Sequence, residues 1–137
     1  MQSKNLVKLA ANVAELLQQL PGPTSKRWPQ GEHFVQAFTH GSMSLELYAP
    51  IGSDSQTPHQ QDELYLIYSG QATLALQGKS IPCGPGSGLF VPAGAEPRCE
   101  SFSSDFSTGV VFWGPAGGDQ AAQAYAEHAA GAGRGSA

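Results

Sequence analysis

Two ionisable residues four positions apart stand directly before a stretch that alternates like a β-strand. His59 and Glu63 lie in the segment TPHQQDELYLIYSG, residues 57–70. Imidazole nitrogens and carboxylate oxygens bind divalent transition metals, and a histidine can also act as a base toward a bound molecule. By the two-residue period of a strand, Glu63 shares a face with Tyr65 and Ile67. This segment is the first candidate for a binding site.

The opposite face of the same stretch is also apolar, because Leu64, Leu66 and Tyr68 alternate with Glu63. We therefore expect the strand to be covered on both sides, as in the wall of a barrel. A carboxylate that points into such an interior needs a cation or hydrogen-bond donors to offset its desolvation. The compensation is either a bound ion or ligand, or a group of the protein such as a backbone turn or Arg98.

The elements that must position these residues are predicted to be strands. Charged residues make up only 13% of the chain, and 17 glycines and 10 prolines indicate many turns. Short stretches with a period of two follow one another without a helix between them, at 33–40, 43–49, 63–70, 72–78, 88–94 and 107–114. This spacing predicts an all-β antiparallel sandwich or barrel.

The ends of the chain have a different character. Apolar residues recur at helical spacing over 5–20 and stop at the Pro-Gly-Pro of 21–23, which predicts an amphipathic helix. With 137 residues the chain suits one compact domain. We divide it into a helix and linker at 1–30, a barrel at 31–115 and an Ala/Gly-rich tail at 116–137, to which we assign no function.

Charge and hydropathy exclude several kinds of partner. The net charge is −4, and the basic residues are scattered apart from Lys26 and Arg27, so we expect no binding of nucleic acid. The N-terminal apolar positions are interrupted by polar ones, which indicates neither a signal peptide nor a membrane span. A cytoplasmic, reduced protein is expected. Cys83 and Cys99 could form a bridge only if the fold brings them together.

Two groups of turn residues carry a family resemblance. In the first, His59, Glu63 and Gly70 match the pattern G-x5-H-x-H-x3-4-E-x6-G, with Thr57 at the position of the first histidine and Gly52 one residue too close to be the leading glycine. This pattern is the first motif of the cupins, which are small jelly-roll barrels.

The second cupin motif, G-x5-P-x-G-x2-H-x3-N, is matched by Gly86, Pro92 and Gly94 at the family spacing. Pro97 stands at the histidine position and Ser101 at the asparagine position. The chain thus resembles a small cupin of the type-2 conserved-barrel kind over about 34–115, with degenerate metal-binding motifs. The segments 54–63 and 94–118 are also similar to small bacterial cupins of unassigned activity. The resemblance implies a cupin-type jelly-roll β-barrel preceded by the N-terminal helix.

The family resemblance also bears on metal binding. Cupins commonly hold iron, manganese, nickel or zinc with three histidines and one glutamate, and here only His59 and Glu63 remain of that set. Thr57 is a poor ligand and Pro97 has no donor atom. Cys99, on the same face as Pro97 by alternation, is the natural substitute, although a core role suits it better. Looser candidates are Gln56, Gln61 and His40. We expect weak or absent metal binding.

Three functions stay open at this point. The first is a small-molecule-binding cupin without strong catalysis, with polar contacts from His59, Glu63 and Thr57 and walls that include Tyr65. The walls would also contain Ile67, Phe90 and Trp113. The second is a metal-dependent oxygenase or isomerase of a small organic acid, in which Cys99 or water completes the metal shell.

The third possible function is metal-free acid and base catalysis, with His59 as the base and Tyr65 as the acid. No catalytic residue is assigned. A homodimer is expected through the apolar outer face of Leu64 and Leu66.

Overall fold

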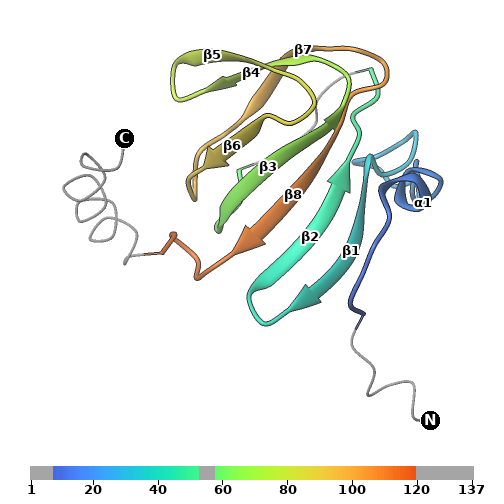
Figure 1. The fold of residues 1–137 in the computed structure, drawn as a ribbon, viewed down its shortest axis with the longest axis horizontal. Helices are drawn as coiled ribbons and strands as arrows, with labels where there is room; N and C mark the ends of the chain where they lie inside the picture. Colours follow the sequence, from blue (N-terminus) through green and yellow to red (C-terminus); the bar gives the residue numbers. More distant parts are fainter. Residues whose placement is uncertain (1–7, 53–57, 120–137) are drawn as a thin grey trace.

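The computed structural model describes residues 8–52 and 58–119 (Figure 1). Within these ranges a short helix, α1 (Val13–Leu17), precedes a series of strands. The strands are β1 (Phe34–His40), β2 (Met43–Tyr48), β3 (Asp62–Ser69), β4 (Ala72–Leu76), β5 (Lys79–Cys83), β6 (Gly88–Val91), β7 (Arg98–Phe102) and β8 (Ser107–Trp113).

The strands form two antiparallel sheets around a common core. One sheet has the order β1-β2-β8-β3-β6 and the other the order β5-β4-β7. Strands far apart in the sequence are neighbours in both sheets, as β2 and β8 or β4 and β7 are, which is the connectivity of a jelly roll. The prediction of an all-β barrel is confirmed. Each of the predicted strands is present.

Two strands were not predicted, β5 and β7. Pro82 interrupts the alternation of β5, and β7 exposes three of its five residues, so neither has a strong period-two signal. Both become strands because they pair with β4, although their own sequences show no clear alternation. The inner faces of both sheets meet in one apolar core, to which Tyr65 and Phe106, almost fully buried, contribute the largest side chains.

The outer face of the five-stranded sheet is covered over one half only. Beside β1 and β2, α1 packs Leu16 against Ala37 and Leu47 (Figure 1). Over β3 and β6 nothing in the described part of the chain covers the apolar side chains. Leu66, Tyr68 and Phe90 are each about half exposed there. The expectation that β3 is covered on both sides is therefore wrong for this chain alone, and a homodimer through this face stays a prediction.

The N-terminal helix is shorter than predicted. It covers only Val13–Leu17, and residues 8–12 are not helical. The side chain of Asn12 accepts a hydrogen bond from the backbone N–H of Glu15 at 3.2 Å and so caps the helix at its N-terminus. Leu9, upstream of this cap, is exposed. Residues 1–7, which include the start of the predicted helix at 5–7, lie outside the described residues, as do residues 120–137, most of the predicted tail.

No helix in the described ranges is long and apolar enough to cross a membrane. Both cysteines, Cys83 and Cys99, are buried free thiols. The cellular location stays a prediction.

Candidate functional site

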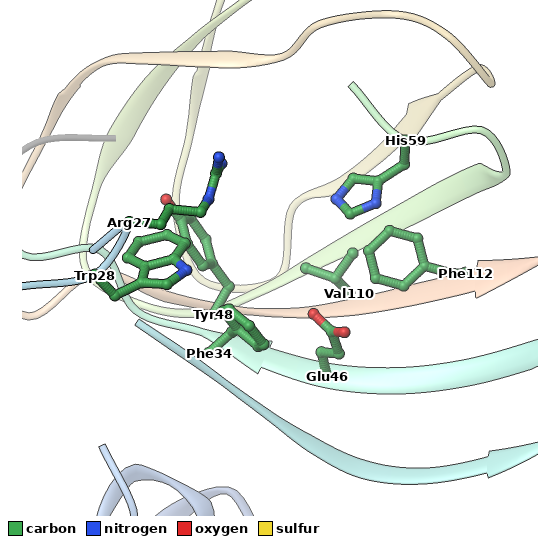
Figure 2. A pocket seen from close by; sticks show the side chains of 8 residues that line it. All are labelled: Arg27, Trp28, Phe34, Glu46, Tyr48, His59, Val110 and Phe112. Atoms are coloured by element: carbon green, nitrogen blue, oxygen red, sulfur yellow. The ribbon is translucent and has the colours of Figure 1, made fainter. Parts of the chain in front are cut away.

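A cavity of about 300 Å³ opens on the inner face of the five-stranded sheet (Figure 2). Its floor and walls are mostly apolar or aromatic, and three ionisable side chains interrupt them. The lining residues are Arg27, Trp28, Phe34, Glu46, Tyr48, His59, Val110 and Phe112.

Strand register explains why these side chains share one space. Glu46 of β2 pairs with Val110 of β8, and residues directly opposite in an antiparallel pair point to the same face. Phe112, two residues further along β8, and Tyr48, two residues further along β2, therefore point inward as well. The adjacent strands β2 and β8 thus place one carboxylate among three apolar or aromatic side chains.

His59 lies on the opposite side of the cavity from Arg27 (Figure 2). Its backbone carbonyl accepts a hydrogen bond from the N–H of Gly94 at 2.8 Å, which joins the segments of the two cupin motifs. Its ring lies 4.5 Å from the ring of Phe112 between centroids. Burial, and secondly the charge of Arg27, lower the pKa of His59 below its usual 6.5, so the imidazole is neutral at pH 7.

Glu46 was missed by the sequence interpretation. Burial, and secondly the negative charge of Glu32, raise the pKa of its carboxyl. The signal was present in the sequence, because Glu46 alternates with Leu45 and Leu47 in the same way that Glu63 alternates with its apolar neighbours.

Glu63 is the most deeply buried ionisable group near the cavity. It is 1% exposed, and neither of its carboxylate oxygens has a hydrogen-bond partner among the described residues. Burial, and secondly the charge of Glu46, raise its pKa to about 7. Arg98 does not compensate it, because Arg98 is exposed and ion-pairs with Glu96 at 3.9 Å.

Several predicted wall residues lie elsewhere. Tyr65 and Ile67 share the face of Glu63, as predicted, but are buried in the core and do not line the cavity. Phe90 pairs with Leu64 and therefore points to the outer face, where its ring lies 6.1 Å from that of Trp113. Phe90 and Trp113 were thus wrong as wall residues. Because Tyr65 does not reach the cavity, the geometry gives no support to its role as an acid opposite His59.

The missing wall comes from a segment that the sequence analysis described as a linker. We call residues 22–32 the 22–32 loop. Its base is closed by Gly22 and Glu32, since the N–H of Gly22 donates to the carbonyl of Glu32 at 2.8 Å. Gly31 has a φ of 101°, and a Cβ there would lie 2.6 Å from the Gly22 carbonyl oxygen, so this position requires glycine. The loop presents Arg27 and buried Trp28 to the cavity.

The sequence does carry a signal for Trp28. It is a lone large aromatic residue in a stretch of small, polar and proline residues. An isolated tryptophan of this kind often packs against the rest of the fold, and here it packs edge-on against the rings of His33 and Phe34 at 4.8 and 5.8 Å between centroids.

The donor atoms of the described residues do not form a metal site of the cupin kind. Among the described residues no three His, Cys, Asp or Glu side chains come together so that they could hold a metal ion. Cys99 packs in the apolar core and does not complete such a group with His59 and Glu63. Pro97 is buried but has no donor. Two ligands are fewer than the three that protein sites for catalytic zinc normally provide.

The remaining candidate ligands are placed as follows. Thr57 and Gln56 lie outside the described residues. Gln61 has a structural role, because its Nε2 donates to the carbonyls of Ser42 at 2.8 Å and Gly114 at 3.0 Å. His40 is exposed at the end of β1 and does not line the cavity.

Comparisons with known proteins agree with this fold. No family model matches the chain. An uncharacterized protein of Streptomyces coelicolor is 36% identical over 84 residues, which cover 60% of this chain and 80% of that protein.

Two solved structures share the architecture. A cupin 2 conserved barrel domain protein from Salinispora arenicola is 18% identical, with a TM-score of 0.50 over 59% of this chain and 74% of its own. A cupin superfamily protein from Desulfitobacterium hafniense is 22% identical, with a TM-score of 0.50 over 58% of this chain and 74% of its own. The chain therefore has the fold of a small cupin barrel.

Proposed function

We propose that this protein binds a small organic molecule in the barrel cavity, with no tightly held metal. The observation that carries the proposal is the cavity itself, about 300 Å³ with largely apolar walls and a few polar groups. Ligand sites in proteins have this composition, since apolar walls supply affinity and a few polar groups fix orientation. The size suits a compact ligand with one ring or a short branched chain.

The polar groups of the cavity determine which hydrogen-bonding groups such a ligand needs. His59 is neutral at pH 7 and offers one donor and one acceptor nitrogen. Glu46 has a raised pKa and lies opposite Val110 on the floor, where a hydroxyl or amine of the ligand can contact it. A ligand with an apolar body and one or two hydrogen-bonding groups fits this arrangement.

The experiment is a ligand-observed NMR screen of small organic compounds against the parent and two cavity-filling variants. Val110→Phe fills the cavity from β8 and Phe34→Trp fills it from β1, so one of them remains useful if the other does not fold. We expect compounds that bind the parent to bind both folded variants at least tenfold more weakly. Leu66→Ser on the outer face is the control and should bind normally. Equal binding by the filled variants would place the ligand elsewhere and refute the proposal.

A metal-dependent enzyme of the oxygenase or isomerase class is the second candidate. It is favoured by Glu63, whose two buried carboxylate oxygens have no hydrogen-bond partner within the described residues. A cation beside this carboxylate would offset its desolvation. Elemental analysis for zinc, manganese, iron and nickel, on protein purified without a metal-binding tag, decides between the two. A content near one ion per chain that Glu63→Gln removes would establish the second candidate.

A further inference from the structure

A second cavity adjoins the first across the 22–32 loop. It measures about 470 Å³ and is lined by Lys26, Arg27, Trp28, Pro29, Gln30, His33, Ile51 and Gly52. Arg27 and Trp28 line both cavities. The two spaces therefore share one wall, and a ligand in one of them contacts the same two side chains as a ligand in the other.

The second cavity differs from the first in its charge. Lys26, Arg27 and His33 supply basic groups, and among the described residues no Asp or Glu lines this cavity. The chain as a whole has a net charge of −4 with only seven lysines and arginines, so two adjacent cations at one cavity are unusual for it. The barrel cavity, in contrast, has Glu46 in its wall and Glu63 buried beside Glu46. The balance of charge therefore favours an anionic group in the second cavity over the first.

The cationic groups stand on an ordered turn. The N–H of Trp28 donates to Oγ of Ser25 at 3.1 Å, and the N–H of Ser25 donates to the carbonyl of Trp28 at 3.0 Å. Lys26 and Arg27 are the two residues between these anchors. The guanidinium carbon of Arg27 lies 5.4 Å from the centre of the Trp28 ring, and His33 packs on Trp28 edge-on. Part of the ordering cost of an anion site is thus already met by the fold.

We propose that the second cavity binds the anionic group, a carboxylate or a phosphate, of the same ligand whose apolar part occupies the barrel cavity. This inference rests on the proposed function and adds the ligand class, a small organic anion with an apolar body. The orientation is fixed by charge: the anion lies at Lys26 and Arg27, and the neutral part extends past Trp28 toward His59 and Glu46. Arg27 and Trp28, which line both cavities, contact both parts.

The test compares an anion with its neutral counterpart, benzoate with benzamide, which have the same ring and nearly the same shape. Trp28 reports binding by its fluorescence in a Trp113→Phe background, since the chain has only two tryptophans. We expect benzoate to bind at least tenfold more tightly than benzamide at low salt and to lose much of that advantage at high ionic strength. Phenyl phosphate and inorganic phosphate distinguish the two kinds of anion.

Variants locate the effect. Lys26→Ala and Arg27→Gln should each reduce the preference for benzoate over benzamide by threefold or more. Lys26→Ala should leave the affinity for benzamide within twofold of the parent value. Lys79→Ala, which removes an exposed lysine of β5, is the matched control and should keep the full preference. Lys26 is exposed, so its replacement is not expected to affect folding.

The outcomes separate this inference from the proposed function. If benzamide binds as tightly as benzoate, and cavity-filling variants abolish both, the anion site is refuted while the barrel cavity remains a ligand site. If inorganic phosphate binds and Lys26→Ala abolishes it, but no aromatic compound reaches the barrel, the anion site exists and the link to a barrel ligand is refuted. If neither phosphate nor benzoate changes the fluorescence of Trp28, the inference fails altogether.

Discussion

The interior of this barrel has two parts with opposite properties. Around Tyr65, Ile67 and Phe106 the space between the sheets is filled by apolar side chains that are almost fully buried. Around Glu46 and His59 the same inner face leaves a cavity and carries ionisable groups. We call these the packed part and the open part. In this barrel the ionisable groups of the candidate site lie where the packing of apolar side chains gives way to a cavity.

The largest effect should come from truncation in the packed part. Phe106 is 2% exposed, and Phe106→Ala should lower the free energy of unfolding by about 3–5 kcal/mol, because it leaves a cavity that the two sheets cannot close. Phe90→Ala is the matched control, since Phe90 is 52% exposed, and it should cost less than about 1 kcal/mol. Urea denaturation measures both. Similar losses for the two variants would contradict the distinction between core and outer face.

The pH dependence of stability should reveal the buried carboxyl of Glu63. Its pKa is about 7 in the folded protein and 4.5 ordinarily, so between these values the folded state holds a proton that the unfolded state releases. The contribution of Glu63 to the free energy of unfolding is therefore fully present below pH 4.5. It falls by about 3 kcal/mol as the pH rises from 4.5 through 7.

The measurement is the difference in unfolding free energy between the parent and Glu63→Gln across this pH range. Taking the difference removes the contribution of His59, whose lowered pKa acts in the opposite direction. We expect the stability of the glutamine variant relative to the parent to increase as the pH rises, so that the variant is at least as stable as the parent at pH 7.5. If the stability of the parent relative to the variant instead increases with rising pH, a cation compensates the charge of Glu63.

Two motif glycines allow a closer comparison of the two parts. Gly70 and Gly94 have φ values of 77° and 82°, so alanine is strained at both by about 1–2 kcal/mol. A Cβ at Gly70 would lie 2.5 Å from Cα of Phe106, whereas nothing lies within 4 Å of a Cβ at Gly94. We expect Gly70→Ala to cost about 2 kcal/mol more than Gly94→Ala. Thermal unfolding of the two variants side by side checks this, and equal losses would mean that backbone strain alone decides both positions.

The smallest effect is expected for Glu46 in the open part. Glu46→Gln keeps the size of the side chain and removes a charge that burial disfavours, so stability at pH 7.5 should change by less than about 1 kcal/mol or rise slightly. The variant should also lower the pKa of Glu63, because the charge of Glu46 is one cause of its elevation. NMR titration of the Glu63 carboxyl carbon measures this shift, and an unchanged pKa would show that burial alone raises it.

The sequence predicted the packed part better than the open part. Alternation over 63–70 correctly placed Glu63, Tyr65 and Ile67 on one buried face, because a strand of a barrel has a single period. Phe90 and Trp113 were misplaced because the pairing of β6 and β8 with β3 decides which face they take, and register is not visible in one strand alone.

The open part depends on relations that are not local. Glu46 reaches the cavity through the pairing of β2 with β8, whose partners are sixty or more residues apart in the chain. Arg27 and Trp28 reach it through a loop whose ends are joined by hydrogen bonds between Gly22, Pro23 and Glu32. Period and composition carry no information about such contacts, whereas His59 could be named in advance because its motif is contiguous.

The 22–32 loop lies where changes in its sequence affect the cavities but not the pairing of the strands. The loop precedes β1 and contributes no strand to either sheet, so changes at its tip leave the hydrogen-bonded ladders of the barrel intact. Exchange of the four residues from Ser25 to Trp28 would give new walls to two neighbouring cavities at once. A barrel of this kind can therefore acquire a new specificity by altering one short peptide, without a search through its core for compensating substitutions.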